Sequence, residues 1–335
     1  MSTIREVAKR AGVSYATVSH VINDTRFVSQ ETRDRVLAAI NELSYRPNAL
    51  ARSLRRGKTN TIGLILPDSA NPFFAEIGHS IEDAAFNLGY SVILCNTERD
   101  THREQLYVDV LSKKQVDGII FVATGEQVDS LNFLLSQDVP VVLIDRDLPN
   151  SEVDAVLTDN QQGGYLAARH LIELGHRRIA CIAGPSHITP SAERIIGYRR
   201  ALEEAGLPYD ETLVMSGDYH PESGRQVTST LLSLNDPPTA IFALNDLMAL
   251  GALRAACQAG CCIPDDLAVI GFDNIDLTSF TNPPLTTIAQ PKAEIGSQAV
   301  NFLAERIKDK TCPPRRVILP TELIVRESTQ PVRPV

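Results

Sequence analysis

The fold of the first part of this chain is decided by the stretch Thr3-Ile-Arg-Glu-Val-Ala-Lys-Arg-Ala-Gly-Val-Ser-Tyr-Ala-Thr-Val-Ser-His-Val-Ile-Asn23. Thr3 and Glu6 have the spacing of a capping box, which predicts the start of a first helix. Gly12 allows a turn, and Ser14 can cap a second helix. Apolar residues recur at helical spacing in both segments. The stretch therefore predicts a helix-turn-helix, a motif whose second helix lies in a DNA major groove.

The second predicted helix has two faces of different chemistry. Val18, Val21 and Ile22 should pack inward, and small or hydroxyl-bearing side chains occupy the rest of the surface. Tyr, Thr, Ser and His can hydrogen-bond base edges or phosphates, and Ala allows close approach. The alternative is the solvated surface of a generic three-helix module, whose third helix we expect over residues 30–43. The predicted DNA contacts of this segment are Thr3, Ser14, Tyr15, Ala16, Thr17, Ser19, His20 and Asn23.

A second short segment, Tyr45–Gly57, is both basic and apolar. Asn48 can cap a short helix there and Gly57 can end it, although a helix of this length is marginal alone. Such a helix suits a minor-groove wedge that inserts a leucine between base steps, and the alternative is a solvated linker. The predicted DNA contacts of this segment are Asn48, Ala51, Leu54 and Arg55.

Composition and charge restrict the class of protein. A chain of 335 residues suits two or three domains. Residues 1–58 hold eleven Lys/Arg against five Asp/Glu, a net charge of +6. Because the whole chain has a net charge of −9, the residues after 58 carry a net charge of −15. A basic head can bind DNA phosphates even when the whole protein is acidic. We expect no signal peptide and no membrane span, and the six cysteines show no metal-ligand spacing, so we predict a cytoplasmic protein without a metal.

The chain resembles the LacI/GalR family of bacterial repressors over essentially its full length. The resemblance is carried by the run Val13-Ser-Tyr-Ala-Thr-Val-Ser-His-Val-Ile-Asn23 and by Arg46-Pro-Asn-Ala-Leu-Ala-Arg-Ser-Leu54. It implies a homodimer whose recognition helices read two half-sites of a pseudo-palindromic double-stranded operator, with Leu54 kinking the centre. It also implies that Tyr15, Ala16 and His20 set specificity. Ala16 and His20 resemble the residues at the same positions in the purine- and ribose-repressor branch of the family. This resemblance implies a CpG-centred operator.

From Thr61 onward, short apolar runs alternate with helical stretches. Such alternation predicts parallel sheets covered by helices. The expected strands are 62–66, 92–94, 118–122, 141–144, 179–182, 240–243 and 267–270. The expected helices are 74–88, 104–114, 163–174, 192–205, 224–234 and 246–259.

This part resembles the type I periplasmic sugar-binding fold, which implies two α/β lobes crossed three times by the chain. The fold class is therefore an all-α helix-turn-helix head with a two-lobed α/β body. The expected domains are a head over 1–46, a hinge over 47–59 and a ligand-binding domain over 60–329. Lobe one takes residues 61–160 and 291–320, and lobe two takes 161–289 and 321–329. The short tail has no leucine heptads, so we expect a dimer rather than a tetramer.

Polar and aromatic residues stand at the predicted strand ends, where ligand crevices form in α/β sheets. Sugars need bidentate hydrogen-bonding groups for neighbouring hydroxyls and aromatic faces for the ring. Taken singly, these residues could be helix caps, turn residues, core residues or surface charges. The predicted ligand-binding residues are Asn71, Phe73, Phe74, Asp145, Arg146, Arg194, Tyr219, Asn245, Asp273 and Gln290.

This set resembles the ribose-binding pattern, except that Tyr219 stands where a Phe is usual. The predicted effector is D-ribose or a related pentose, and its binding should shift the hinge helices off the operator. Another aldose or polyol, a purine or nucleoside, and a protein corepressor stay open. A sugar transport receptor is disfavoured by the basic head. No phosphate loop, dinucleotide motif or nucleophile elbow is present, so we predict neither an enzyme nor a cofactor.

Overall fold

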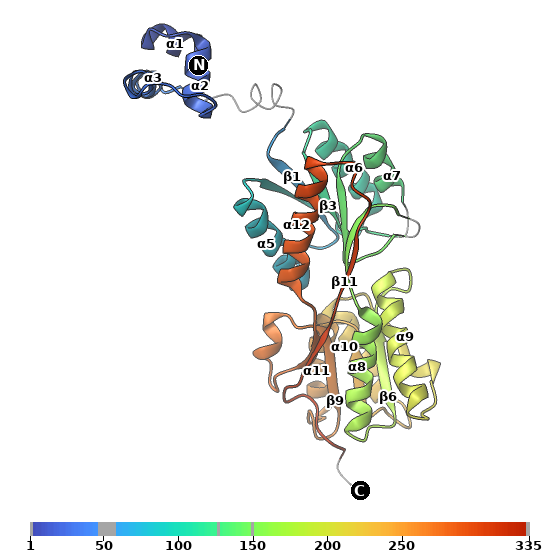
Figure 1. The fold of residues 1–335 in the computed structure, drawn as a ribbon. Helices are drawn as coiled ribbons and strands as arrows, with labels where there is room; N and C mark the ends of the chain where they lie inside the picture. The colour runs from blue at the N-terminus through green and yellow to red at the C-terminus, as the bar shows by residue number, and fades with distance from the viewer. Residues whose placement is uncertain (1–2, 46–57, 126–127, 149–150, 333–335) are drawn as a thin grey trace. The chain divides into compact units, whose positions relative to one another are not determined.

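The computed structural model describes residues 3–45, 58–125, 128–148 and 151–332 (Figure 1). Two units make up the chain, residues 1–59 and residues 60–335. Each unit has its own apolar core. Among the described residues, no helix combines the length and the apolar character that crossing a bilayer requires.

The described part of the first unit contains three helices, α1 (Ile4–Ala11), α2 (Tyr15–Asn23) and α3 (Gln30–Glu42). The predicted capping box is confirmed, because Thr3 Oγ1 accepts a hydrogen bond from Glu6 N and Glu6 Oε2 accepts one from Thr3 N (3.3 and 2.7 Å). Gly12 ends α1 in the left-handed region at φ 65°, where a residue without a Cβ is unstrained. Val7 and Val36, from different helices, are fully buried in the shared core.

The described residues of the second unit form two six-stranded sheets. In lobe one the strand order is β11-β5-β4-β3-β1-β2, and in lobe two it is β12-β10-β9-β8-β6-β7. Every strand pair is parallel except the antiparallel pair of β10 and β12. Lobe one is built from β1 (Thr61–Leu66), β2 (Ser91–Asn96), β3 (Gly118–Phe121), β4 (Val141–Ile144), β5 (Asp154–Thr158) and β11 (Arg316–Leu319). Lobe two is built from β6 (Ile179–Ala183), β7 (Val214–Ser216), β8 (Ala240–Ala243), β9 (Ala268–Asp273), β10 (Thr286–Ala289) and β12 (Glu322–Ile324).

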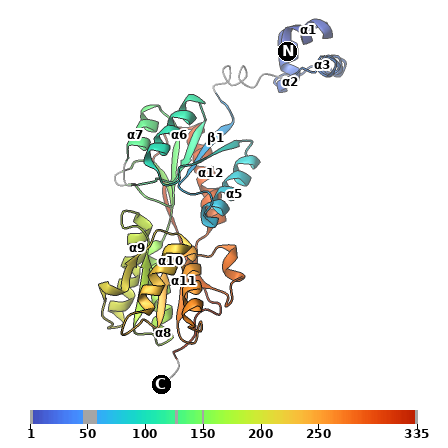
Figure 2. The same ribbon diagram turned by 180° about the vertical axis from the view of Figure 1, so that it is seen from behind.

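Helices cover both faces of each sheet (Figures 1 and 2). Strands buried on both faces explain why β3, β4, β6, β8 and β9 read as continuous apolar runs. The helices of lobe one are α5 (Pro72–Asn87), α6 (Thr101–Lys113), α7 (Asp129–Ser136) and α12 (Lys292–Lys308). The helices of lobe two are α8 (Asn160–Glu173), α9 (Thr189–Glu204), α10 (Pro221–Leu232), α11 (Asp246–Ala259) and the 3₁₀ turns η1 (Glu211–Leu213) and η2 (Asp276–Ser279).

The chain passes between the two sheets three times, after β5, after β10 and after β11. Within lobe two, α8 and α9 pack so closely that glycine is required at their contact. A Cβ on Gly197 would lie 2.0 Å from the main-chain oxygen of Gln161, and one on Gly164 would lie 2.1 Å from that of Arg194. This close approach fixes the position of Arg194 on α9 relative to α8.

Candidate functional site

A cavity lies between the two lobes, at the carboxyl ends of their strands. Nine of the ten predicted ligand-binding residues line it, and these are Asn71, Phe73, Phe74, Asp145, Arg146, Arg194, Tyr219, Asn245 and Asp273. The tenth, Gln290, lies behind Asp273 and donates a hydrogen bond from Nε2 to its Oδ1 (2.8 Å). Three further residues of the cavity wall, Arg99, Ile188 and Pro190, were not expected.

Two asparagines of the cavity act as helix caps as well. Asn71 Oδ1 accepts a hydrogen bond from Phe73 N (3.0 Å) at the start of α5, and Asn245 Oδ1 accepts one from Met248 N (2.9 Å) at the start of α11. Asn245 also donates to the main-chain oxygen of Tyr219 (3.1 Å). The capping role that the sequence left open is therefore present, and it places both side chains at the cavity.

Three cavity residues have left-handed backbone conformations. The φ angles are 65° at Asp145, 69° at Tyr219 and 113° at Asp273. Conformations of this kind are costly for residues other than glycine, so they persist only where surrounding contacts hold them. Because all three side chains line the cavity, the unusual backbone is concentrated where a ligand would be recognised.

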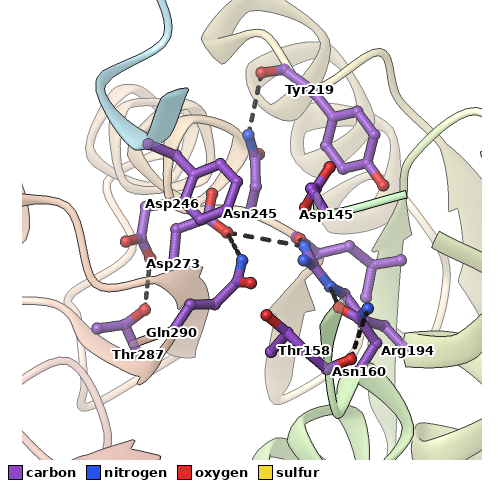
Figure 3. A network of polar contacts seen from close by, with 12 residues as sticks. Asp145, Thr158, Asn160, Arg194, Tyr219, Asn245, Asp246, Asp273, Thr287 and Gln290 are labelled. Atoms are coloured by element: carbon purple, nitrogen blue, oxygen red, sulfur yellow. Dashed lines mark hydrogen bonds and ion pairs between the residues drawn. The ribbon is translucent and has the colours of Figure 1, made fainter. Parts of the chain in front are cut away.

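Arg194 is the centre of the polar network on lobe two (Figure 3). Its Nε donates to Asn160 Oδ1 (2.9 Å) and its Nη1 donates to the main-chain oxygen of Leu244. Nη1 also lies 3.8 Å from Asp273 Oδ1. Asn160, which holds the guanidinium in place, begins α8 and was missed in the sequence because nothing local distinguishes it from an ordinary polar residue at a helix start.

Asp145 and Arg146 form the charged wall on lobe one. Arg146 Nη1 donates to the main-chain oxygens of Ala123 and Thr124 (2.6 and 3.2 Å), and Arg146 Nε lies 3.6 Å from Asp145 Oδ2. Burial raises the pKa of Asp145 and lowers the pKa of Arg146, and the attraction between the two charges opposes both effects. Within the part of the chain that the structure describes, buried Arg146 Nε has no hydrogen-bond partner, which leaves a donor available to a ligand.

Two buried carboxyl groups lie close together on lobe two. Asp246 accepts hydrogen bonds from Thr287 Oγ1 (2.6 Å) and Ile275 N (2.9 Å), and Asp273 accepts the one from Gln290. Burial raises the pKa of Asp273 to about 7, and the attraction of Arg194 opposes that rise. Burial, together with repulsion from Asp273, raises the pKa of Asp246 well above its usual value. One of the two groups is therefore favoured in its neutral form, which can donate as well as accept a hydrogen bond.

Aromatic rings supply the apolar part of the cavity wall. The rings of Phe73 and Phe74 have centroids 5.1 Å apart and are inclined at 61°, an edge-to-face pair. Tyr219 comes from the other lobe and, like both phenylalanines, is buried. The cavity therefore offers ring faces together with charged groups, which is the combination that a polyhydroxylated ring requires.

On the first unit, the predicted DNA-reading residues differ in exposure. Thr3, Ser14, Tyr15 and Ala16 are exposed, whereas Thr17, His20 and Asn23 are half-buried. His20 Nδ1 lies 2.8 Å from Thr25 Oγ1, within hydrogen-bond distance. The predicted helix caps Thr3 and Ser14 are both present. Ser14 Oγ accepts a hydrogen bond from Thr17 N (3.1 Å) at the start of α2.

Ser19 is a correction to the predicted surface. It was expected to point outward, but it is buried with Val18 and Val21 on the inner face of α2. Its side chain is small enough to fit at the edge of the core, and Asn23 Nδ2 donates to its main-chain oxygen (2.7 Å). The predicted contacts Asn48, Ala51, Leu54 and Arg55 lie outside the described residues.

Comparisons with known proteins agree with both units. Residues 3–48 match the model of bacterial regulatory proteins of the lacI family, and residues 59–327 match that of periplasmic binding proteins and the sugar binding domain of the LacI family. The HTH-type transcriptional repressor PurR of Photobacterium profundum is 42% identical over 331 residues, covering 98% of this chain and 99% of that repressor.

Two solved structures extend the comparison. The Lac repressor dimer bound to operator and the anti-inducer ONPF is 30% identical, covers 98% of this chain and 99% of its own, and has a TM-score of 0.89. A LacI family transcriptional regulator from Enterococcus faecium with bound ribose is 35% identical, covers 82% and 100%, and has a TM-score of 0.76. The chain belongs to the LacI family and is a DNA-binding transcriptional repressor with a helix-turn-helix head and a two-lobed ligand-binding domain.

Proposed function

We propose that this repressor responds to a pentose-sized sugar, with D-ribose as the first candidate. The observation that carries the proposal is the cavity itself, which two carboxyl groups and three guanidinium groups line beside aromatic rings. Carboxylate and guanidinium groups form paired hydrogen bonds with neighbouring hydroxyls, and aromatic faces pack against the C–H face of a sugar ring.

A purine or nucleoside is the second candidate, and the name of the PurR relative favours it. A flat base is best held between parallel ring faces, whereas Phe73 and Phe74 are inclined at 61° to each other. The charged groups also face the cavity from both lobes, which suits a ligand with hydroxyls on several sides. These two features support the sugar, and so does the ribose bound to the similar regulator from Enterococcus faecium.

We propose the following partners on DNA. The protein acts in the cytoplasm as a homodimer on a pseudo-palindromic, CpG-centred operator, with α2 of each head in the major groove and Leu54 at the central step. Exposed Tyr15 and Ala16 on α2 support the first contact. The basic charge of residues 1–58 supports the phosphate contacts.

The proposed control uses both lobes. A ligand in the cavity contacts lobe one through Asp145 and Arg146 and lobe two through Arg194 and Asp273, so it holds one particular arrangement of the lobes. If that arrangement is unfavourable for hinge helices in the minor groove, the ligand lowers operator affinity. The size of the effect equals the difference in ligand affinity between the two states.

The test is fluorescence anisotropy with a CpG-centred pseudo-palindrome, with and without D-ribose, at fixed salt because phosphate contacts dominate affinity. Calorimetric titrations with D-ribose, hypoxanthine and guanine identify the ligand. Operator release by D-ribose supports the proposal. Binding of a purine with no heat from D-ribose would replace the first candidate by the second. If the protein fails to bind this duplex at every ligand concentration, the proposed CpG-centred operator is wrong.

A further inference from the structure

Lys292 connects the turn at Asp273, which lines the effector cavity in lobe two, to helix α5 of lobe one. It is the first residue of α12, two positions after Gln290, and it follows the second passage of the chain between the lobes. Its Nζ donates to the main-chain oxygens of Asp273 (3.2 Å) and Asn274 (2.5 Å) in lobe two. The same Nζ lies 2.6 Å from Glu76 Oε2 on α5 of lobe one.

These three contacts use the full donor capacity of the ammonium group. A lysine has three N–H donors and no acceptor, and here each donor has an oxygen within reach. The side chains of Lys292 and Glu76 are only 13% and 29% exposed, so solvent screens their attraction less than it screens a surface pair. The ammonium is therefore held firmly between the two lobes.

The lobe-two end of this contact is the turn that carries Asp273. Asp273 and Asn274 have φ angles of 113° and 51°, a backbone that needs surrounding contacts to persist. Gln290 Nε2 holds the carboxyl group of Asp273, and Lys292 Nζ holds its carbonyl oxygen. A ligand that moves the backbone of Asp273 therefore also moves the acceptors of Lys292.

The lobe-one end is α5, which reaches the cavity by a second route. Phe73 and Phe74 in its first turn line the cavity, and Glu76 lies in the following turn. Helix α5 therefore contributes side chains to the cavity directly, and it is also connected to Asp273 in lobe two through Lys292.

We propose that Lys292 is a positioning residue that transmits occupancy of the site at Asp273 to α5 through Glu76. The inference rests on the proposed function, since it concerns the regulation of the same site. Lys292 does not line the cavity, so it acts through Asp273 and not through contact with the ligand.

The experiment compares Lys292→Met, Glu76→Gln and the double variant in the full chain. The operator dissociation constant is measured with and without saturating D-ribose, and the ratio of the two is the coupling. Both single variants should lower that ratio at least ~5-fold, a typical size for linkage between sites. The double variant should lower it no further, because each change breaks the same contact. A role confined to stability would leave the ratio of the folded protein unchanged.

Two substitutions on the same helices serve as controls. Lys308→Met removes an exposed lysine at the end of α12, and Glu82→Gln removes an exposed carboxylate on α5, so both should keep the wild-type ratio. Wild-type coupling in Lys292→Met and Glu76→Gln would overturn the inference. The same holds if the effects of the two single variants add in the double variant.

A measurement without any ligand separates this inference from the proposed function. If D-ribose does not act on the wild-type protein, the proposed effector is wrong, and amide hydrogen exchange of the ligand-free chain then decides the inference. Glu76→Gln, a change on lobe one, should accelerate exchange over residues 273–279 of lobe two, whereas Glu82→Gln should not. Equal exchange in the two variants would mean that Lys292 does not link the lobes.

Discussion

The guanidinium carbon of Arg194 lies 3.6 Å from the centroid of the Phe272 ring. The residue after Phe272 is Asp273, whose Oδ1 faces the same guanidinium at 3.8 Å. One strand end therefore supplies both a stacking face and a counter-charge. Gly163 on α8 leaves the room that the ring occupies, since a Cβ there would lie 2.6 Å from Phe272 Cε2. Arg194 is thus fixed in a plane by contacts that a flexible ammonium cannot make.

Replacing Arg194 by lysine should weaken the binding of D-ribose about 10- to 100-fold, because the planar fork and the stacking are lost while the charge stays. Calorimetric titration measures the change. Operator affinity without ligand should stay within a factor of about two. Arg199→Lys on the exposed face of the same helix is the control. Unchanged affinity in Arg194→Lys would remove this residue from the site.

The contribution of Asp273 to the stability of the ligand-free protein should fall as the pH rises from about 4 to about 7. Burial raises the pKa of Asp273 to about 7, above a value near 3.9 in the unfolded chain, so the native state keeps a proton that the unfolded state has lost. The slope that one such group contributes is at most ~1.4 kcal/mol per pH unit. Urea unfolding of the wild type and of Asp273→Asn between pH 5 and 8 measures it.

The variant Asp273→Asn should lose this component, so the unfolding free energy of the wild type relative to that of the variant should fall as the pH rises over the same interval. Asp276→Asn, three residues further along and exposed, should retain the wild-type dependence. Parallel curves for all three proteins would mean that Asp273 is ionised throughout.

Gly197→Ala should destabilise the ligand-binding domain by about 3 kcal/mol or more. The new Cβ would lie 2.0 Å from a main-chain oxygen of α8, so the two helices must move apart and the α8–α9 interface must repack. Thermal unfolding reports the loss. Gly78→Ala on α5 is a matched control, because the atoms nearest its Cβ lie at 3.7 Å and alanine is the better helix former. Similar melting temperatures for both variants would contradict the close contact.

Tyr15→Ala should weaken specific operator binding by about 1–3 kcal/mol while leaving binding to unrelated DNA within a few-fold. The side chain is 62% exposed on α2, so its removal costs little stability. Anisotropy titrations with the operator and with a scrambled duplex at one salt concentration measure both quantities. Leu37→Ala, at a comparably exposed position on α3, should leave both unchanged. Equal loss on both duplexes would indicate a phosphate contact instead of a base contact.

The sequence predicted those parts of the fold that leave a local pattern. Capping residues and apolar spacing located α1, α2 and α3, and α11 and β8 begin and end where the periodicity indicated. Other helices begin two or three residues earlier than expected, because their first turns contain Pro, Thr or Asn ahead of the apolar repeat. Strands of three residues, such as β7 and β12, are too short to show a period.

Contacts between distant segments could not be predicted in this way. Asp154 begins β5 and is completely buried, which a single sequence would not suggest for a carboxylate. Burial alone would raise its pKa, but hydrogen bonds from Arg315 and Arg306 hold the pKa below its usual value. Both arginines lie more than 150 residues further along the chain. Asn160 at the back of Arg194 escaped prediction for the same reason.

Each of the two sheets receives its final strand from residues 316–324, where β11 completes lobe one beside β5 and β12 completes lobe two beside β10. Strand β5, which pairs with β11, leads to Asn160, and strand β10, which pairs with β12, leads to Gln290. Asn160 holds Arg194 by a hydrogen bond, and Gln290 holds Asp273 in the same way. Residues 316–324 therefore support both halves of the ligand site at once, although they lie more than 25 residues beyond Gln290 in the sequence.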